Sequence, residues 1–177
     1  MKKILITGGP STGKTELVSE LERHGFYCFH EISREITQKM RKKGIKQFFL
    51  ENPIKFSKEL FKLRYKQYKL NINLSTYSVY DRGPIDVLAY LNFKNIEIPK
   101  NLVSTSKKIN YDYIFILRPW KEIYINDSER YETFEQSLDI DKSLQKTYES
   151  FNLSLTEIPK ISTKERIKFI KKVVGYE

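Results

Sequence analysis

Cysteine and histidine are scarce in this sequence of 177 residues, which holds one cysteine and two histidines. Cys28 has no second cysteine in the chain with which to form a disulfide. Together with His24 and His30 it does not form a cluster with the spacing of a metal-binding motif. The sequence therefore excludes an internal disulfide framework and a metal centre built from clustered cysteine and histidine.

Long apolar runs are also missing, although 40% of the residues are hydrophobic. The longest runs, such as 114–117, are far shorter than the roughly 20 residues that a membrane-spanning helix needs. No signal-peptide pattern precedes the first glycines. We therefore expect a cytoplasmic protein with a single domain over 1–177, because a chain of this length suits one full core better than two small ones.

Acidic residues are fewer than basic ones, since 22 Asp and Glu stand against 32 Lys and Arg and give a formal net charge of +10. Such a charge is typical of proteins that bind nucleic acids, membrane surfaces or small polyanions. The lysines are spread along the chain, however, and no block of five or six like charges occurs. The densest stretch, 41–46, is typical of a solvated helix end, so the charge alone selects no partner.

Short apolar runs alternate with segments of helical periodicity along the whole chain. The runs predict buried strands, and the periodic segments predict helices whose ends are marked by glycine, proline and a Ser-x-x-Glu capping box. This order predicts an α/β domain of three layers, in which helices cover both faces of a five-stranded parallel sheet. The expected strands are 2–7, 26–30, 77–80, 113–117 and 153–158, and the expected helices are 14–24, 32–43, a long helix from 52, 85–91, 137–151 and a last helix from 162.

A glycine-rich segment lies between the first expected strand and the first expected helix. It matches the Walker A pattern G-x-x-x-x-G-K-[ST] at every defined position. In such a loop the main-chain N–H groups and the helix N-terminus form a concave anion site. We expect Lys14 to reach the β- and γ-phosphates of ATP or GTP, and Thr15 to offer its hydroxyl to Mg²⁺. The residues predicted to bind the nucleotide are Gly8, Gly9, Pro10, Ser11, Thr12, Gly13, Lys14 and Thr15.

Charged side chains stand at the carboxyl ends of three expected strands. Glu31 follows the second strand, Asp81 the third and Arg118 the fourth. Because the carboxyl ends of parallel strands meet at one edge of a sheet, these side chains should surround the phosphates. Asp81 is a candidate ligand of Mg²⁺, and Glu31 is a candidate for accepting or orienting the proton of a substrate hydroxyl. The structural alternative for Asp81 is an ion pair with Arg82, and that for Glu31 is an exposed carboxylate at a helix start, favoured by the helix dipole.

A segment of mixed charge and little periodicity, approximately 118–136, follows the fourth expected strand. It is placed like a lid, whose closure over bound nucleotide would exclude water and bring Arg118 or Arg130 to the transferring phosphate. The alternative is a surface loop in which Arg130 pairs with a neighbouring carboxylate.

Two sequence features of other nucleotide hydrolases are missing. The fourth expected strand ends without the acidic residue that motor-type ATPases usually carry there. The Asn-Lys-x-Asp element by which signalling GTPases recognise their base is also missing from the sequence. A kinase needs neither feature, so both absences favour phosphoryl transfer to an acceptor.

Several blocks of residues carry a family resemblance. They are the Walker A segment with its leading strand, His-Glu-Ile-Ser-Arg-Glu at 30–35, the block 80–91, and the block 112–117 with 126–130 after it. A weaker block is Ile158-Pro159 followed by Arg166. In these blocks the chain resembles the NadR-type ribosylnicotinamide-kinase-like P-loop family, whose AAA-type ATP-binding domains are similar to nucleoside and nucleotide kinases.

The resemblance implies a sheet of nucleoside-kinase type with strand order 2-3-1-4-5 and ATP-dependent phosphorylation of a small hydroxyl-bearing metabolite, such as a nucleoside or nucleotide. It also implies that Glu31 and Asp81 lie in the acceptor and metal sites and that Arg130 lies in the lid. One departure is that the family often has Asp-Gly-x-Arg where this chain has Asp-Ser-Glu-Arg at 127–130.

If the chain is a kinase, the sequence motifs and the family resemblance together assign candidate roles to individual residues. Asp86 is expected to face the acceptor, although capping of the helix N-terminus explains its position nearly as well. The predicted catalytic residues are Lys14, Glu31, Asp81, Arg118 and Arg130, the predicted Mg²⁺ ligands are Thr15 and Asp81, and the predicted acceptor contacts are Glu31, Arg34, Arg82 and Asp86.

Other functions are compatible with a nucleotide site. A non-enzymatic ATP- or GTP-binding regulatory module, or a hydrolase with another role, would use the same loop. A nucleic-acid end kinase would draw on the net charge and on an aromatic content of 14%, since aromatic rings stack on unpaired bases. Most of these aromatics occur at core spacing, so a small-molecule acceptor is favoured. The sequence leaves the acceptor, the preferred base and the oligomeric state open.

Overall fold

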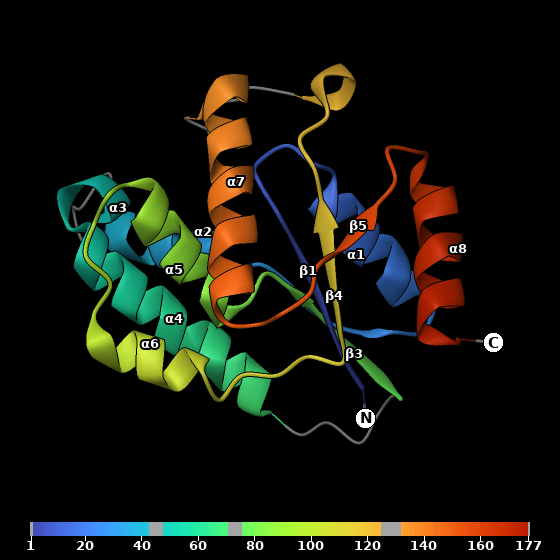
Figure 1. Ribbon diagram of the computed structural model, residues 1–177, viewed down its shortest axis with the longest axis horizontal. Helices are drawn as coiled ribbons and strands as arrows, with labels where there is room; N and C mark the ends of the chain where they lie inside the picture. Colours follow the sequence, from blue (N-terminus) through green and yellow to red (C-terminus); the bar gives the residue numbers. More distant parts are fainter. Residues whose placement is uncertain (1, 43–47, 71–75, 125–131, 177) are drawn as a thin grey trace.

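A parallel β-sheet forms the centre of the computed structural model, which describes residues 2–42, 48–70, 76–124 and 132–176 (Figure 1). The sheet has five strands in the order β2-β3-β1-β4-β5, and all neighbouring strands run parallel. Both the predicted α/β class and the predicted strand order are confirmed. The strands are β1 (Lys2–Gly8), β2 (Tyr27–Phe29), β3 (Tyr77–Asp81), β4 (Tyr113–Leu117) and β5 (Thr156–Ile158).

The central strands are buried on both faces, which explains the continuous apolar runs Ile4-Leu5-Ile6 in β1 and 114–117 in β4. Ile4, Leu5 and Ile6 of β1 are fully buried. The register of the sheet pairs Ile6 with Asp81 and Gly8 with Leu117, so β1, β3 and β4 end at the same edge. The loop after β1 therefore begins beside the ends of its two neighbouring strands.

Helices cover both faces of the sheet (Figure 1). On one face α1 and α8 pack on β1, β3 and β4, and on the other face α5 and α7 pack on the same strands, with α4 against α5. Each layer buries apolar side chains that the strands alone would leave in water. The helices are α1 (Lys14–Arg23), α2 (Ser33–Arg41), α3 (Phe48–Glu51), α4 (Pro53–Lys69), α5 (Pro84–Phe93), α6 (Lys100–Ser106), α7 (Phe134–Ser150) and α8 (Thr163–Val174), with a 3₁₀ turn η1 (Lys121–Ile123).

Two predicted helix starts are confirmed by their caps. Asn52 accepts the N–H of Lys55 at 3.1 Å, and proline follows it at the first position of α4. Ser162 and Glu165 exchange side-chain and backbone hydrogen bonds in front of α8, as the Ser-x-x-Glu pattern predicted. These caps satisfy backbone donors that have no partner within the helix.

Other boundaries differ from the sequence expectation. The helices α3 and α6, of 4 and 7 residues, were not predicted, because so few turns show little periodicity. Strand β5 is shorter than expected at 3 residues, and α7 begins at Phe134 instead of 137. The helix expected over 32–43 corresponds to α2, which ends at Arg41, and position 43 lies outside the described residues. Within the described part of the chain, no helix is both long enough and apolar enough to cross a membrane.

The packing of α7 on the sheet predicts the effect of matched substitutions in one helix. Leu144 is fully buried, whereas Leu138 is 39% exposed. We expect Leu144→Ala to lower the free energy of unfolding by about 2–5 kcal/mol, because it removes buried methyl groups and leaves a cavity. Leu138→Ala should change it by no more than about 0.5 kcal/mol. Urea denaturation followed by circular dichroism measures both values, and equal losses would contradict this account of the core.

Candidate functional site

The loop between β1 and α1 has a backbone that only glycine fits at two positions. Gly8 has φ +142° and Gly13 has φ +85°, both in the left-handed region. A Cβ at Gly8 would collide with the main-chain carbonyl of Leu117, and a Cβ at Gly13 would lie 3.0 Å from a guanidinium nitrogen of Arg166. Helix α1 starts directly after Gly13 without a side-chain cap, so its first N–H groups remain available to an anion.

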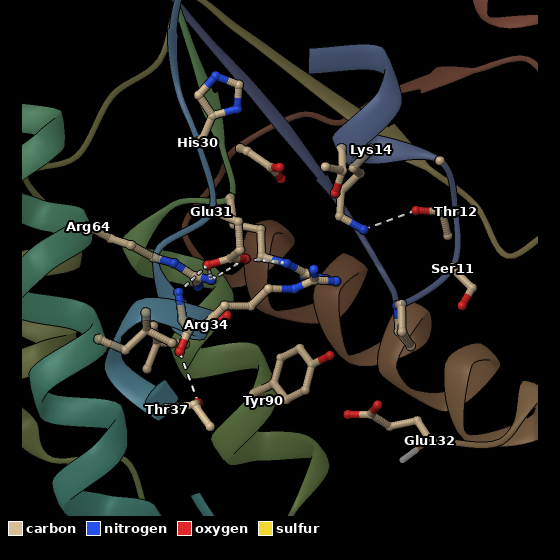
Figure 2. A pocket seen from close by; sticks show the side chains of 18 of the residues that line it. Ser11, Thr12, Lys14, His30, Glu31, Arg34, Thr37, Arg64, Tyr90 and Glu132 are labelled. Atoms are coloured by element: carbon tan, nitrogen blue, oxygen red, sulfur yellow. Dashed lines mark hydrogen bonds and ion pairs between the residues drawn. The ribbon is translucent and has the colours of Figure 1, made fainter. Parts of the chain in front are cut away.

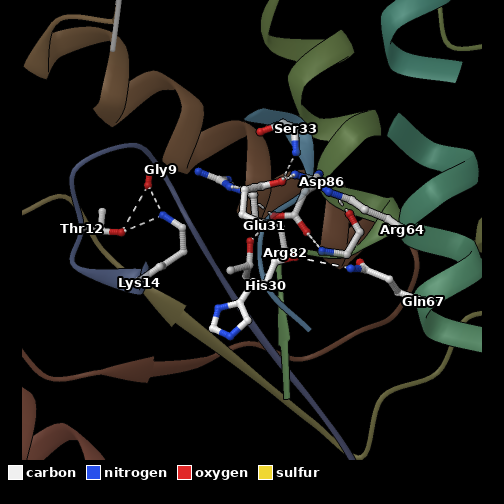
Figure 3. A network of polar contacts seen from close by, with 12 residues as sticks. Gly9, Thr12, Lys14, His30, Glu31, Ser33, Arg64, Gln67, Arg82 and Asp86 are labelled. Carbon is white, nitrogen blue, oxygen red and sulfur yellow. Dashed lines mark hydrogen bonds and ion pairs between the residues drawn. The ribbon is translucent and has the colours of Figure 1, made fainter. Parts of the chain in front are cut away.

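Lys14 lies inside this loop rather than in solvent. Its ammonium group donates to the carbonyl oxygen of Gly9 and, at 3.0 Å, to the hydroxyl of Thr12 (Figure 3). Burial, and next the charge of Arg82, lower the pKa of Lys14 to about 7, although Asp81 and nearby carboxylates oppose this shift. An anion bound in the loop would favour the charged ammonium form.

Asp81 ends β3 on the wall of the same cavity as Lys14 and Thr15. It is buried, and its Oδ1 atom has no hydrogen-bond partner among the described residues. Burial raises the pKa of Asp81, against the opposing charge of Lys14. A buried carboxylate oxygen without a partner and the hydroxyl of the exposed residue Thr15, both on the wall of this cavity, are the hard oxygen ligands that Mg²⁺ binds, so the residues fit the ion.

The described residues contain no group of three or more His, Cys, Asp or Glu that could hold a metal ion by themselves. This suits Mg²⁺, which is commonly held by one or two protein ligands, substrate phosphates and water.

Glu31 sits between two guanidinium groups (Figures 2 and 3). Arg64 donates from one nitrogen to both carboxylate oxygens at 2.7 and 2.8 Å, and Arg82 Nε lies 2.8 Å from Oε2. The N–H of Ser33 adds a hydrogen bond of 3.0 Å. Burial by itself would raise the pKa of Glu31, but Arg64, Arg82 and these hydrogen bonds lower it to about 2.

For Glu31 and Arg82, the structure agrees in part with the functional interpretation and in part with the structural one. Glu31 accepts a backbone N–H at the start of α2, as a carboxylate at a helix start would, but its side chain is only 18% exposed and lines the cavity, so the exposed carboxylate of the structural alternative is not found. Arg82 lines the cavity too, and it pairs with Glu31 rather than with Asp81. Its φ of +68° is unusual for a side chain other than glycine, and its N–H donates to the carbonyl of Ile6 at 3.0 Å.

Asp86 is fully buried behind the cavity wall, and it is not among the residues that line the cavity. Its carboxylate accepts hydrogen bonds from the hydroxyl of Thr7, from the N–H of Gly83 at 2.7 Å and from the hydroxyl of Tyr148 at 2.8 Å. The capping alternative therefore describes Asp86, and the structure does not bring it to the position of a direct acceptor contact.

The two arginines predicted for the lid have different outcomes. Arg118 pairs with Asp141 at 2.8 Å and with Glu157 at 3.2 Å, and it is not among the residues that line the cavity. This places its side chain in a contact between β4, α7 and β5. Arg130 lies outside the described residues. The flanks of the predicted lid do reach the cavity, through Trp120 and Glu132.

One cavity of about 880 Å³ joins these elements (Figure 2). Its phosphate half is formed by the glycine-rich loop, the start of α8 and Trp120, over whose ring Arg166 lies at 5.3 Å. Its other half is formed by the ends of β2 and β3 with α2, α4 and α5. The side chains of this second half include Glu31, Arg34, Thr37, Arg41, Phe56, Leu60, Arg64, Arg82, Tyr90 and Lys94.

Sequence reasoning missed Arg64. It stands on α4, 33 positions after the carboxylate it contacts. It shares the buried face of the helix with Ser57, Leu60 and Phe61. An arginine at a core position of an amphipathic helix is the signal that could have identified it, because a charge there requires a buried partner.

The comparisons with known proteins agree with this geometry. The model of the AAA domain family matches residues 3–166. None of the curated proteins matches the sequence. Among solved structures, deoxyadenosine kinase from M. mycoides with dCMP and a flexible dCDP bound has a TM-score of 0.72 at 16% identity, and the match covers 98% of each chain.

Two further structures share the fold. NadR protein in complex with NR has a TM-score of 0.76 at 18% identity, over 99% of this chain and 52% of that chain, so this chain spans about half the length of NadR. Thymidylate kinase from Candida albicans has a TM-score of 0.64 at 16% identity, over 98% and 91% of the two chains. Since the family model spans most of the sequence, the chain belongs to the AAA domain family. Its fold is the one found in NadR and in the nucleoside and nucleotide kinases among these structures.

Proposed function

We propose that the chain is a kinase that binds ATP or GTP with Mg²⁺ and transfers the γ-phosphoryl group to a small hydroxyl-bearing metabolite, a nucleoside or nucleotide. One observation carries the proposal. The Walker A loop faces, within one cavity, a carboxylate held by two buried guanidinium groups. A hydrolase needs only the first of these elements, whereas a kinase also needs a site that orients an acceptor.

Nucleotide binding would exchange one set of contacts of Lys14 for another. The ammonium group now donates to Gly9 and Thr12. With a triphosphate in the loop it would turn to the β- and γ-phosphate oxygens, while the N–H groups at the start of α1 contact the phosphates. This change brings the positive charge to the bond that breaks, where negative charge develops during transfer.

Thr15 and Asp81 would hold Mg²⁺, directly or through its water shell. When bound, the ion would neutralise charge on the phosphates and fix their orientation. Asp81 already lies in a buried position close to Lys14, and its Oδ1 atom has no hydrogen-bond partner in the described part of the chain.

Glu31 would orient the acceptor. A carboxylate whose pKa is about 2 stays ionised at neutral pH, so it accepts a hydrogen bond well but retains a proton poorly. Arg64 and Arg82 hold both of its oxygens in place, which fixes the direction of that hydrogen bond. The role that fits this environment is positioning of the acceptor rather than retention of its proton.

The structural neighbours support an acceptor of small size. The deoxyadenosine kinase and thymidylate kinase act on nucleosides and nucleotides by their names, and NadR was solved with NR and with NAD and AMP-PNP. At identities of 16–18% these proteins share only the fold with this chain. The choice among acceptors therefore requires a direct assay.

A screen of metabolites for ATP-dependent phosphorylation, read by product mass, tests the proposal. We expect one class of nucleoside or nucleotide to gain the mass of a phosphoryl group. Lys14→Ala should abolish the transfer, because it removes the ammonium from the phosphates, while Lys168→Ala on the exposed face of α8 should not. Nucleotide binding without turnover on any acceptor would instead favour a regulatory module.

The lowered pKa of Lys14 predicts that nucleotide binding depends on pH. A free site with a pKa of about 7 is largely neutral at higher pH, and bound phosphates raise that pKa, so binding takes up a proton. Affinity for MgATP should fall by up to about tenfold per pH unit between about pH 7.5 and 9. Calorimetry in two buffers of different ionisation enthalpy measures the proton uptake. A buffer-independent enthalpy would show that Lys14 is charged before binding.

Asp81 predicts a metal-dependent loss. Asp81→Asn keeps the shape of the side chain but removes the charge, so we expect Mg²⁺-dependent turnover to fall by about 10- to 100-fold or more. Far-UV circular dichroism should stay unchanged. The control is Asp139→Asn, which changes an exposed carboxylate of α7 that pairs with Lys142 in its own helix turn. Turnover near the normal rate in Asp81→Asn would remove Asp81 from the metal site.

A further inference from the structure

The half of the cavity that faces the phosphate loop contains buried guanidinium groups, some of whose N–H donors have no partner among the described residues. Arg64 is 4% exposed and the side chain of Arg82 is 12% exposed. Both contact Glu31, yet Arg64 Nε and Arg82 Nη1 have no hydrogen-bond partner among the described residues. Arg82 Nη1 approaches the carboxylate of Asp86 only to 4.0 Å. A buried charged donor without a partner is costly, so both sites suit a ligand that supplies an acceptor oxygen.

The charge of this half is positive. Glu31 lies between the two guanidinium groups, and Asp86 lies 4.0 Å from Arg82 Nη1, so two carboxylates face these two cations. The lining residues described for this half nevertheless include more basic than acidic side chains. The basic ones are Arg34, Arg41, Arg64, Arg82 and Lys94, and the acidic ones are Glu31, Asp81 and Glu132. Figure 2 shows Arg34 among the side chains that line the same cavity as Arg64, Glu31 and Lys14. A neutral or cationic acceptor would leave this excess unbalanced.

Apolar and aromatic side chains complete the same half. Phe56 and Leu60 of α4 and Tyr90 and Leu91 of α5 line it. An inorganic anion would leave this surface exposed to water, whereas a flat organic ring would cover it. The occupant should therefore combine a ring with an anionic group.

Resting on the proposed function, we propose that the phosphoryl acceptor is a nucleoside 5′-monophosphate and that its phosphate binds among Arg34, Arg64 and Arg82. Guanidinium groups suit this role, because their planar donors match phosphate oxygens in pairs. The ring would lie against the aromatic and apolar side chains of α4 and α5.

Transfer of the γ-phosphoryl group to a nucleoside monophosphate needs no group that accepts a proton. An oxygen of the monophosphate dianion forms a bond to the γ-phosphorus of ATP. The bond from that phosphorus to the bridging oxygen breaks, and the electron pair leaves with ADP. The second pKa of a phosphate monoester is about 6, so the acceptor oxygen has no proton to lose at neutral pH. Glu31, whose pKa is about 2, then serves to fix Arg64 and Arg82 rather than to take up a proton.

Matched acceptors test the assignment. Adenosine, cytidine, guanosine, uridine and thymidine are each compared with their 5′-monophosphates at saturating MgATP, and products are measured by mass. We expect kcat/KM for the best monophosphate to exceed that of its nucleoside by at least about tenfold, the value of a hydrogen bond to a charged group. Arg34→Gln and Lys94→Gln should each raise KM for the monophosphate about tenfold or less, with a smaller effect on the nucleoside. Lys62→Gln, an exposed charge on α4, is the matched control and should change neither.

The outcomes separate this inference from the proposed kinase activity. If nucleosides are phosphorylated as well as or better than their monophosphates, the inference is overturned while the kinase remains. If nothing is phosphorylated, calorimetric binding of the same monophosphates to the Lys14→Ala protein decides, because that variant weakens the phosphate loop. Binding that Arg34→Gln and Lys94→Gln weaken would support the inference. Absence of binding, or binding that neither variant changes, would overturn it.

Discussion

The two walls of the cavity are tied together by one buried carboxylate, Asp86. It receives hydrogen bonds from Thr7 at the end of β1, from Gly83 in the turn after β3 and from Tyr148 on α7. These three partners belong to the phosphate loop's leading strand, to the turn that carries Arg82 and to the helix that covers the sheet. Because a buried carboxylate must keep its partners, the turn and the loop cannot shift independently. The distance between the two halves of the cavity is thus set in the core.

Much of this architecture was accessible from the sequence because it depends on local patterns. The Walker A segment lies between a buried strand and a helix, where Gly8 and Gly13 adopt positive φ values. Continuous apolar runs predicted β1 and β4, since these strands are buried on both faces. The strand order came from the family resemblance, and the model and the structural neighbours confirm it.

The parts that could not be predicted depend on contacts between distant segments. Sequence spacing placed Arg118 at the end of a strand, but the direction of its side chain is decided by Asp141 and Glu157, which come later in the chain. Asp86 stands at a helix start, where capping and substrate contact predict the same residue type. Arg64 becomes relevant only when α4 packs beside the end of β2. In each case the deciding partner is supplied by tertiary packing and carries no local signature.

The contact of Lys14 with Gly9 affects how the phosphate loop binds a phosphate group. The ammonium group lies on the concave side of the loop and donates to the carbonyl oxygen of Gly9 and the hydroxyl of Thr12. These hydrogen bonds stabilise the conformation of the loop. A phosphate that binds then replaces the hydrogen bonds of Lys14 to the loop, and it does not have to order a flexible segment. Such an exchange lowers the entropy lost on association, yet it subtracts the energy of the contact that is given up. A smaller entropy loss combined with the loss of an existing contact favours rapid and reversible binding of the nucleotide.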